Sequence, residues 1–263
     1  MSKTMLMKGK YLDKIQLGIK STNSYRSSKE VISDLEDSTT VIDNQLSALL
    51  FIEKTRYDFW RLYFYIQDIT KINWAFFEEK SLLAEIVVRQ SKKKQWDAII
   101  QAFEKKGKFK IYDEYIRLAL EKSSDNVRGT DFSVLEACHE NDLISIQHLI
   151  EANFNFYSDR IPSVEELKTL TNTTFLIKDQ GRIVAFFITE KKGVTLEFRY
   201  WLVLKKYRGR KYGRILMNRV LTFDPEIKRV TSWISKKNKN VILAHKQLGF
   251  KEDGLTNYIL HRE

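Results

Sequence analysis

Apolar positions recur with strand and helix periodicities along the second half of the chain, and polar turn residues separate them. The predicted strands are 132–138, 173–178, 183–190, 195–204 and 229–235, with one or two terminal strands in 250–261. The predicted helices are 141–150, 213–223 and 238–248, with another starting at Ser163. Glu166, three residues after Ser163, is typical of a capped helix start. This order predicts a mixed α/β sheet with helices on both faces.

The first half of the chain has a different pattern at its start. Residues 1–45 are polar, and we expect them to be helical in part. The later elements are a predicted hairpin of strands 46–54 and 58–67, a strand at 83–90, a helix at 92–106 and a strand at 109–118. The polar segment 122–130 contains Gly129 and separates the two patterned regions. We therefore expect an N-terminal α/β domain at 1–125 and a second domain at 126–263.

A short internal similarity links the two halves. Residues 98–110 resemble residues 240–251, with one extra residue in the first copy, and both place a helix and a glycine before a strand. The first copy has no basic glycine loop. The N-terminal domain is thus interpreted either as a degenerate copy of the second, without catalytic function, or as an unrelated lid or dimerisation domain.

Composition narrows the class of protein. The single cysteine excludes an internal disulfide framework and fits a reducing cytoplasm. No apolar run reaches the ~18 residues of a membrane helix, and neither a signal peptide nor zinc-ligand spacing is present, so we expect no membrane or metal partner. The net charge of +11 favours an anionic ligand. Interspersed acidic residues argue against nucleic acid.

The most informative segment is 195–219, where an aromatic strand ends in a short basic loop and a helix follows. Backbone N–H groups at a helix start bind phosphate or diphosphate, and glycines let the ligand approach the main chain. Six basic residues surround this loop: Lys205, Lys206, Arg208, Arg210, Lys211 and Arg214. We therefore expect a strongly anionic ligand here.

Two motifs are similar to those of the GNAT superfamily, the acyl-CoA-dependent N-acyltransferases. The loop 208–213 resembles the family's Arg/Gln-x-x-Gly-x-Gly/Ala, with Arg208 and Gly213 matching and Lys211 in place of the first Gly. Residues 238–250 resemble the family helix that begins near an Asn and ends in Tyr-x-x-x-Gly-Phe, with His245 in place of the Tyr. The resemblance implies a mixed, mostly antiparallel sheet flanked by helices in 126–263.

The resemblance also implies how an acyl-CoA is held. Its pantetheine arm is expected to pair with the strand backbone, its diphosphate to lie on the loop and helix start, and Asn238 to cap its helix and touch the arm. The expected donor-binding residues are Leu202, Val203, Leu204, Arg208, Gly209, Arg210, Lys211, Tyr212, Gly213, Arg214 and Asn238. Phe154, Phe156 and Tyr157 lie where the family builds its acceptor site, with core packing as their alternative role.

Two residues are candidates for proton transfer. Attack on a thioester needs a neutral amine, and Glu197, on the strand before the loop, is the candidate base. Its alternative role is an ion pair with Arg199 or with a base of a neighbouring strand. His245 is the candidate acid for the leaving thiolate. The alternatives are that His245 only packs or binds water, that Tyr200 or Tyr258 donates, or that no acid is needed.

The leading hypothesis is an N-acetyltransferase that moves acetyl from acetyl-CoA to a primary amine of a small molecule, amino sugar or peptide, without a metal. Acetyl is inferred by analogy with the superfamily. The alternatives are a non-catalytic CoA-binding regulatory protein and an aminoacyl-tRNA-dependent transferase. We expect the first domain to complete the acceptor cleft. The sequence leaves open whether the chain forms a homodimer.

Overall fold

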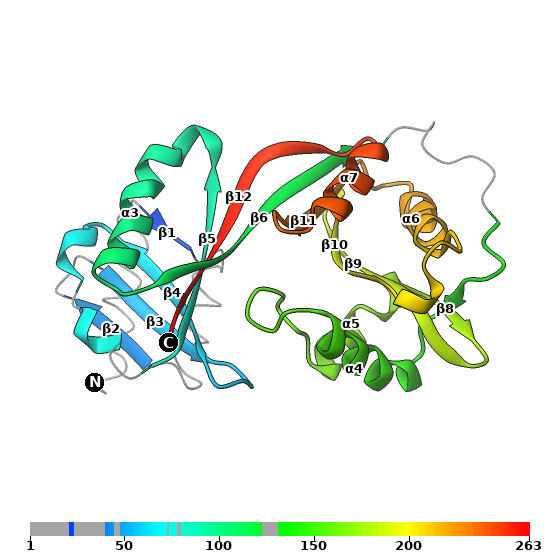
Figure 1. The fold of residues 1–263 in the computed structure, drawn as a ribbon, viewed down its shortest axis with the longest axis horizontal. Coiled ribbons are helices and arrows are strands. Elements are labelled where there is room, and N and C mark those ends of the chain that lie inside the picture. Colours follow the sequence, from blue (N-terminus) through cyan, green and yellow to red (C-terminus); the bar gives the residue numbers. More distant parts are fainter. Residues whose placement is uncertain (1–20, 24–39, 45–47, 73, 78–79, 123–130) are drawn as a thin grey trace. The chain divides into compact units, whose positions relative to one another are not determined.

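The computed structural model describes residues 21–23, 40–44, 48–72, 74–77, 80–122 and 131–263 (Figure 1). Two compact units divide the chain: Met1–Tyr115 with Gly254–Glu263, and Ile116–Asp253. The sequence placed the division after residue 125 and the last strand in the second domain. That strand, β12 (Lys251–Arg262), instead pairs antiparallel with β5 (Leu82–Arg89) of the first unit from Leu255 onward. Most of the predicted helical segment 1–45 lies outside the described residues.

The first unit contains an open sheet with strand order β2-β3-β4-β5-β12. Strands β2, β3 and β4 pair antiparallel, which confirms the predicted hairpin, whereas β4 and β5 pair parallel. Its further elements are β1 (Ser21–Thr22), β2 (Thr40–Asn44), β3 (Ala48–Lys54), β4 (Trp60–Ile66), η1 (Ile69–Lys71), η2 (Trp74–Phe77), η3 (Gln90–Lys92) and α3 (Lys93–Lys105). Strand β6 (Lys110–Glu121) has residues in both units.

Helix α3 covers the core of the first unit. Trp96, Ile99, Ile100 and Phe103 are its buried residues, as the helical spacing predicted. The ring of Phe103 lies 5.2 Å from that of Phe64 on β4, so the helix packs directly on the sheet.

The second unit has the strand order β11-β10-β9-β8-β7. All these pairings are antiparallel except that of β10 with β11, which confirms the expected mixed, mostly antiparallel sheet. The elements are β7 (Glu136–Ala137), η5 (Glu140–Asp142), α4 (Leu143–Asn153), α5 (Val164–Thr169), η6 (Thr171–Thr173), β8 (Thr174–Asp179), β9 (Arg182–Lys192), β10 (Thr195–Val203), η7 (Lys205–Tyr207), α6 (Tyr212–Phe223), β11 (Arg229–Ser235) and α7 (Lys239–Gln247).

One predicted strand is much shorter than expected. The sequence predicts a strand over 132–138, but only Glu136–Ala137 pair with β8. A turn takes the rest, because Ser133 donates its backbone N–H to the Asp131 carboxylate and Leu135 donates to the Phe132 carbonyl.

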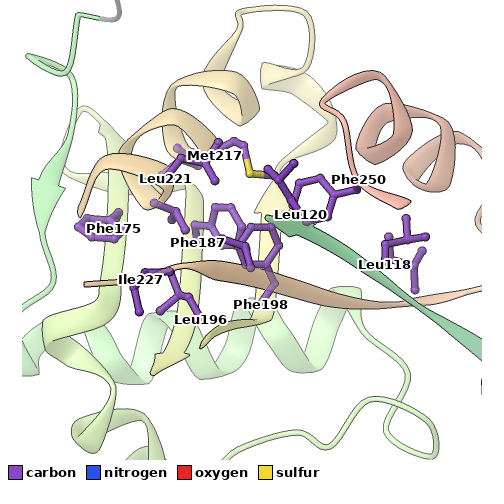
Figure 2. Close-up of a cluster of buried hydrophobic side chains, with 14 of the residues drawn as sticks. Leu118, Leu120, Phe175, Phe187, Leu196, Phe198, Met217, Leu221, Ile227 and Phe250 are labelled. Carbon is purple, nitrogen blue, oxygen red and sulfur yellow. The ribbon is translucent and has the colours of Figure 1, made fainter. Parts of the chain in front are cut away.

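Helices lie on both faces of the second sheet. Apolar residues of β9 and β10 meet Met217 and Leu221 of α6 in one buried cluster, which Figure 2 shows around Phe187 and Phe198. A second cluster joins the opposite face to α4 and α5. Ser163 and Glu166 form the predicted capping box of α5. The two faces therefore present separate surroundings to the strand that leads into the basic loop.

Candidate active site

Strands β10 and β11 run side by side and then part. Their parallel pairing ends at Phe198 and Ser232, whereas β10 continues to Val203 and β11 to Ser235. Main-chain groups on the β11 side of β10 are therefore released from the ladder beyond Phe198. We call this place the β10–β11 divergence.

A β-bulge lies where the strands part. The pairing of β10 with β9 shifts by one residue between Phe198 and Tyr200. Strict strand alternation would put Leu196, Phe198, Tyr200 and Leu202 on one face of the sheet. The extra residue at the bulge reverses the alternation beyond Phe198. Leu196 and Phe198 belong to the α6-side cluster, and Tyr200 and Leu202 belong to the α4–α5-side cluster.

The ladder shows which main-chain groups of β10 face the divergence. Leu204, directly after β10, donates its N–H to the carbonyl of Val184 in β9. The N–H and C=O groups of successive residues alternate between the two sides of a strand. The main-chain groups of Leu202 are therefore also directed toward β9, whereas those of Trp201 and Val203 are directed toward the divergence. Of the three strand residues predicted to pair with a donor, only Val203 offers its backbone there. Trp201, which the sequence analysis does not name among the donor-binding residues, has its main-chain groups on the same side as Val203, because it lies two residues before it.

The loop after β10 contains two left-handed residues. Gly209 has φ of 84°, and Lys211 has φ of 66°. Lys211 stands where the GNAT motif has its first Gly, so a lysine holds a conformation that glycine adopts at little cost. The predicted turn thus forms despite this departure from the motif.

Helix α6 begins directly after Lys211. The N–H groups of Tyr212, Gly213 and Arg214 belong to its first turn, where a helix has no carbonyl of its own to offer them. Lys211, the N-cap residue, provides no side-chain cap. A Cβ added at Gly213 would lie 3.1 Å from the Trp201 ring, so the helix start packs closely on β10. These donors and the helix dipole suit an anion.

Positive charge is concentrated around this helix start. Residues 198–223 include eight Lys and Arg and no Asp or Glu. The exposed cations of the loop and first turn are Lys205, Lys206, Arg208, Arg210, Lys211 and Arg214. Arg208 donates from Nε to the Val203 carbonyl at 3.2 Å, which brings its guanidinium to the divergence. Tyr207, whose hydroxyl donates to Asp179 at 2.8 Å, joins the loop to the β8–β9 hairpin.

Glu197 belongs to a ring of four charged groups. Its carboxylate lies 3.1 Å from the Lys192 ammonium and 3.9 Å from the Arg199 guanidinium, and both cations also contact Glu190. These are the ion pairs that one reading of the sequence expected. Glu197 also pairs in register with Thr231 of β11, one residue before the strands part. The carboxylate is thus 20% exposed and next to the divergence.

His245 is buried on the α6-facing side. Its Nδ1 lies 2.9 Å from the Val241 carbonyl oxygen. Its ring packs in T-shaped contacts, with its centroid 5.5 Å from that of Trp201 and 5.0 Å from that of Phe250. A carbonyl only accepts, so Nδ1 carries the proton and Nε2 keeps its lone pair. Nε2 is buried without a hydrogen-bond partner. Burial lowers the pKa of His245, so the neutral ring predominates at neutral pH.

The other named side chains have contacts of their own. The Tyr200 hydroxyl donates to the Arg160 carbonyl, and burial raises the pKa of Tyr200 to about 12. Tyr258 packs in the core of the first unit. Phe154 packs edge-on against Tyr200 at 5.3 Å, in keeping with a core role.

One predicted role at the edge of the site has a direct structural counterpart. Asn238 accepts from the Val241 N–H and caps α7, as expected. Phe156 is exposed, and its ring centroid lies 4.3 Å from that of Tyr157 in the α4–α5 loop.

Among the described residues, no helix is both long and apolar enough to cross a bilayer.

Comparison with known proteins agrees with this geometry. Residues 143–250 match the acetyltransferase (GNAT) family. The fold is similar to a GCN5-related N-acetyltransferase from Sphaerobacter thermophilus, with 14% identity, a TM-score of 0.60, and 91% of this chain and 86% of that chain covered. It is also similar to a tandem GNAT protein from the clavulanic acid biosynthesis pathway, with 11% identity, a TM-score of 0.60, and 97% and 93% covered. No curated protein sequence matches the chain.

Residues 143–250 are therefore a GNAT-family domain, and the chain carries an acyltransferase of that family. The match lies wholly within the second unit, Ile116–Asp253. The resemblance first seen in two short motifs is confirmed for this part of the chain.

Proposed function

We propose that the second unit transfers an acetyl group from acetyl-CoA to a primary amine of a small molecule, amino sugar or peptide. The observation that carries this proposal is the β10–β11 divergence, which leads to an uncapped, basic helix start. An amide-bearing arm followed by a diphosphate requires both features in this order. Family membership supports the acyl transfer, and the choice of acetyl is made by analogy.

Main-chain groups hold the donor in this proposal. The pantetheine amides pair with Trp201 and Val203, which face the divergence. The diphosphate accepts from the N–H groups of Tyr212, Gly213 and Arg214 and from those of the loop 209–211. The exposed cations neutralise the phosphates, with Arg208 in reach of Val203. Asn238 holds the start of α7 at the same edge, because parallel strands end together.

Glu197 is the base in this proposal. It removes a proton from the acceptor ammonium, through a water molecule, so that the nitrogen lone pair can attack the thioester carbonyl. Lys192 and Arg199 hold the carboxylate in place through their ion pairs with it. The C–S bond then breaks, and CoA leaves as a thiolate. A thiol has a pKa of ~8.5, so this leaving group needs little help near neutral pH.

His245 has a structural role in the simplest form of this mechanism. The neutral ring, with Nδ1 donating to Val241, has no proton on Nε2 to give. It supports Trp201, whose indole also stacks on Phe187 at 5.0 Å. A second candidate function, a CoA-binding protein without turnover, is favoured by this missing acid and by Lys211. The single Cys138 supports a cytoplasmic location.

Substitution of the base tests the chemistry. We expect Glu197→Gln to lower kcat by about 100- to 1,000-fold, while the KM for acetyl-CoA changes little, because the carboxylate acts on the acceptor. Glu190→Gln is the matched control, since it removes the other carboxylate of the same ion-pair ring. The measurement is thiol release with a panel of amines.

Four results would count against the proposal. Equal loss of kcat in both variants would mean that the ring acts only as a structural ion pair. No turnover by the wild type with any amine, together with acetyl-CoA binding, would favour the non-catalytic alternative. Absence of micromolar binding or of a higher melting temperature with acetyl-CoA would exclude both. Salt-sensitive retention on immobilised tRNA would instead favour the aminoacyl-tRNA-dependent alternative.

A further inference from the structure

The two units repeat one arrangement of strands. In the first, β2, β3 and β4 pair antiparallel and β5 joins β4 in parallel. In the second, β8, β9 and β10 pair antiparallel and β11 joins β10 in parallel. A helix, a glycine and a strand follow in each case, at α3 and at α7. The similarity of 98–110 to 240–251 falls on these matching elements.

The parallel strands of the first unit also part. Strands β4 and β5 pair only at Trp60–Leu82 and Arg61–Leu83, whereas β4 continues to Ile66 and β5 to Arg89. We call this place the β4–β5 divergence. It corresponds to the β10–β11 divergence of the second unit.

A short segment of the chain itself lies against β4 at this place. Ser21 and Thr22 pair antiparallel with Ile66 and Tyr65. The buried Asn23 side chain donates from Nδ2 to the Leu62 carbonyl at 2.9 Å and accepts at Oδ1 from the Phe64 N–H at 2.7 Å. One side-chain amide therefore satisfies both partners that a peptide-like amide would use.

The alternation of β4 shows that these groups face the divergence. Trp60 donates its N–H to the carbonyl of Ser81, just before β5, so the main-chain groups of Trp60 are directed away from β3. Leu62 and Phe64 lie two and four residues further along, so their main-chain groups are directed to the same side. Asn23 thus pairs with the backbone of β4 on the side that β5 has left.

The connection between β4 and β5 lacks the features of a diphosphate site. Residues 67–81 contain no glycine, and their two lysines are outnumbered by three acidic residues. The corresponding segment of the second unit has the glycine-containing basic loop and the twelve-residue α6.

We propose that Ser21–Asn23 is a built-in occupant of the β4–β5 divergence and takes the place of an acyl donor's amide-bearing arm. The first unit is therefore closed to acyl-CoA, and each chain has a single donor site, in the second unit. The number of donor sites, one per chain, rests on the proposed function of the second unit. The pairing of Asn23 with β4 is independent of that function.

Hydrogen exchange at single amides of the full-length chain tests whether Asn23 occupies the β4–β5 divergence. We expect the Phe64 amide to exchange at least ten-fold faster in Asn23→Ala than in the wild type, with a smaller change at Tyr63, whose groups face β3. Asn153→Ala is the matched control, because it also removes an asparagine side chain bonded to a carbonyl, that of Leu149. Equal Phe64 exchange in the wild type and Asn23→Ala would overturn the proposal.

Calorimetry with acetyl-CoA tests the consequence. One site per wild-type chain is expected, and two sites of similar affinity would overturn the single-site inference. No binding at all would contradict the proposed function of the second unit. The exchange rate of Phe64 would then still decide whether Asn23 occupies the divergence.

Discussion

Lys211 holds a left-handed backbone conformation at the start of α6, with φ of 66° and ψ of 5°. A residue with a Cβ is strained in this region by about 1 kcal/mol relative to glycine. We expect Lys211→Gly to raise the free energy of unfolding by about that amount. Urea unfolding measures it. Lys211→Ala is the control, because it removes the charge but keeps the strain, and an equal gain in both variants would contradict the argument.

His245 predicts a pH dependence of stability. Burial holds its folded pKa below the ordinary value near 6.5, so the unfolded chain takes up the proton first as the pH falls. The contribution of His245 to stability is full above pH ~6.5 and is lost as the pH falls from there toward the folded pKa. We expect His245→Phe to lose less stability over this interval than the wild type.

Denaturant unfolding between pH 7.5 and 5 provides the comparison for His245. His261, whose pKa is also lowered by burial, contributes the same slope to both proteins and cancels. Identical pH slopes for the two proteins would mean that His245 is not held neutral by its surroundings.

The contact of helix α6 with strand β10 depends on a small residue at one position. A Cβ at Gly213 would lie 3.1 Å from the Trp201 ring. We expect Gly213→Val to displace the helix start, to destabilise the fold by about 1–3 kcal/mol, and to raise the Kd for acetyl-CoA at least ten-fold. Gly213→Ala should have a much smaller effect on both. The measurements are thermal unfolding and calorimetry, and unchanged binding in Gly213→Val would contradict this packing.

Most elements near the site could be predicted from local patterns, but their long-range relations could not. The strand 229–235 and the capped start of α5 agree with the periodicity and the Ser163–Glu166 spacing. The bulge before Tyr200 leaves the alternating pattern of apolar residues intact, so the pattern alone does not show that the side chains change faces there. The role of Asn23 depends on pairing with β4, about 40 residues away, which no local pattern reveals.

The division of the whole chain into units has a direct consequence for truncation. Residues 254–263 belong to the first unit, where β12 pairs with β5. A fragment of 126–263 would expose the main-chain groups of this strand and its buried Ile259 and Leu260.

We therefore expect the fragment 126–263 to aggregate or to unfold without a cooperative transition. The full-length chain, measured alongside by thermal unfolding and size-exclusion chromatography, should remain a folded species. A soluble fragment with the melting temperature and acetyl-CoA affinity of the full chain would contradict the assignment of β12 to the first unit.

For the whole molecule, we propose that acetyl-CoA lies along β10 and on the start of α6. Hydrogen exchange of the full-length chain, with and without saturating acetyl-CoA, tests it most directly. We expect slower exchange at Trp201, Val203 and the amides of 209–214, with little change at the β4–β5 divergence. Unchanged exchange at these amides in the presence of bound acetyl-CoA, or protection only in the first unit, would contradict it.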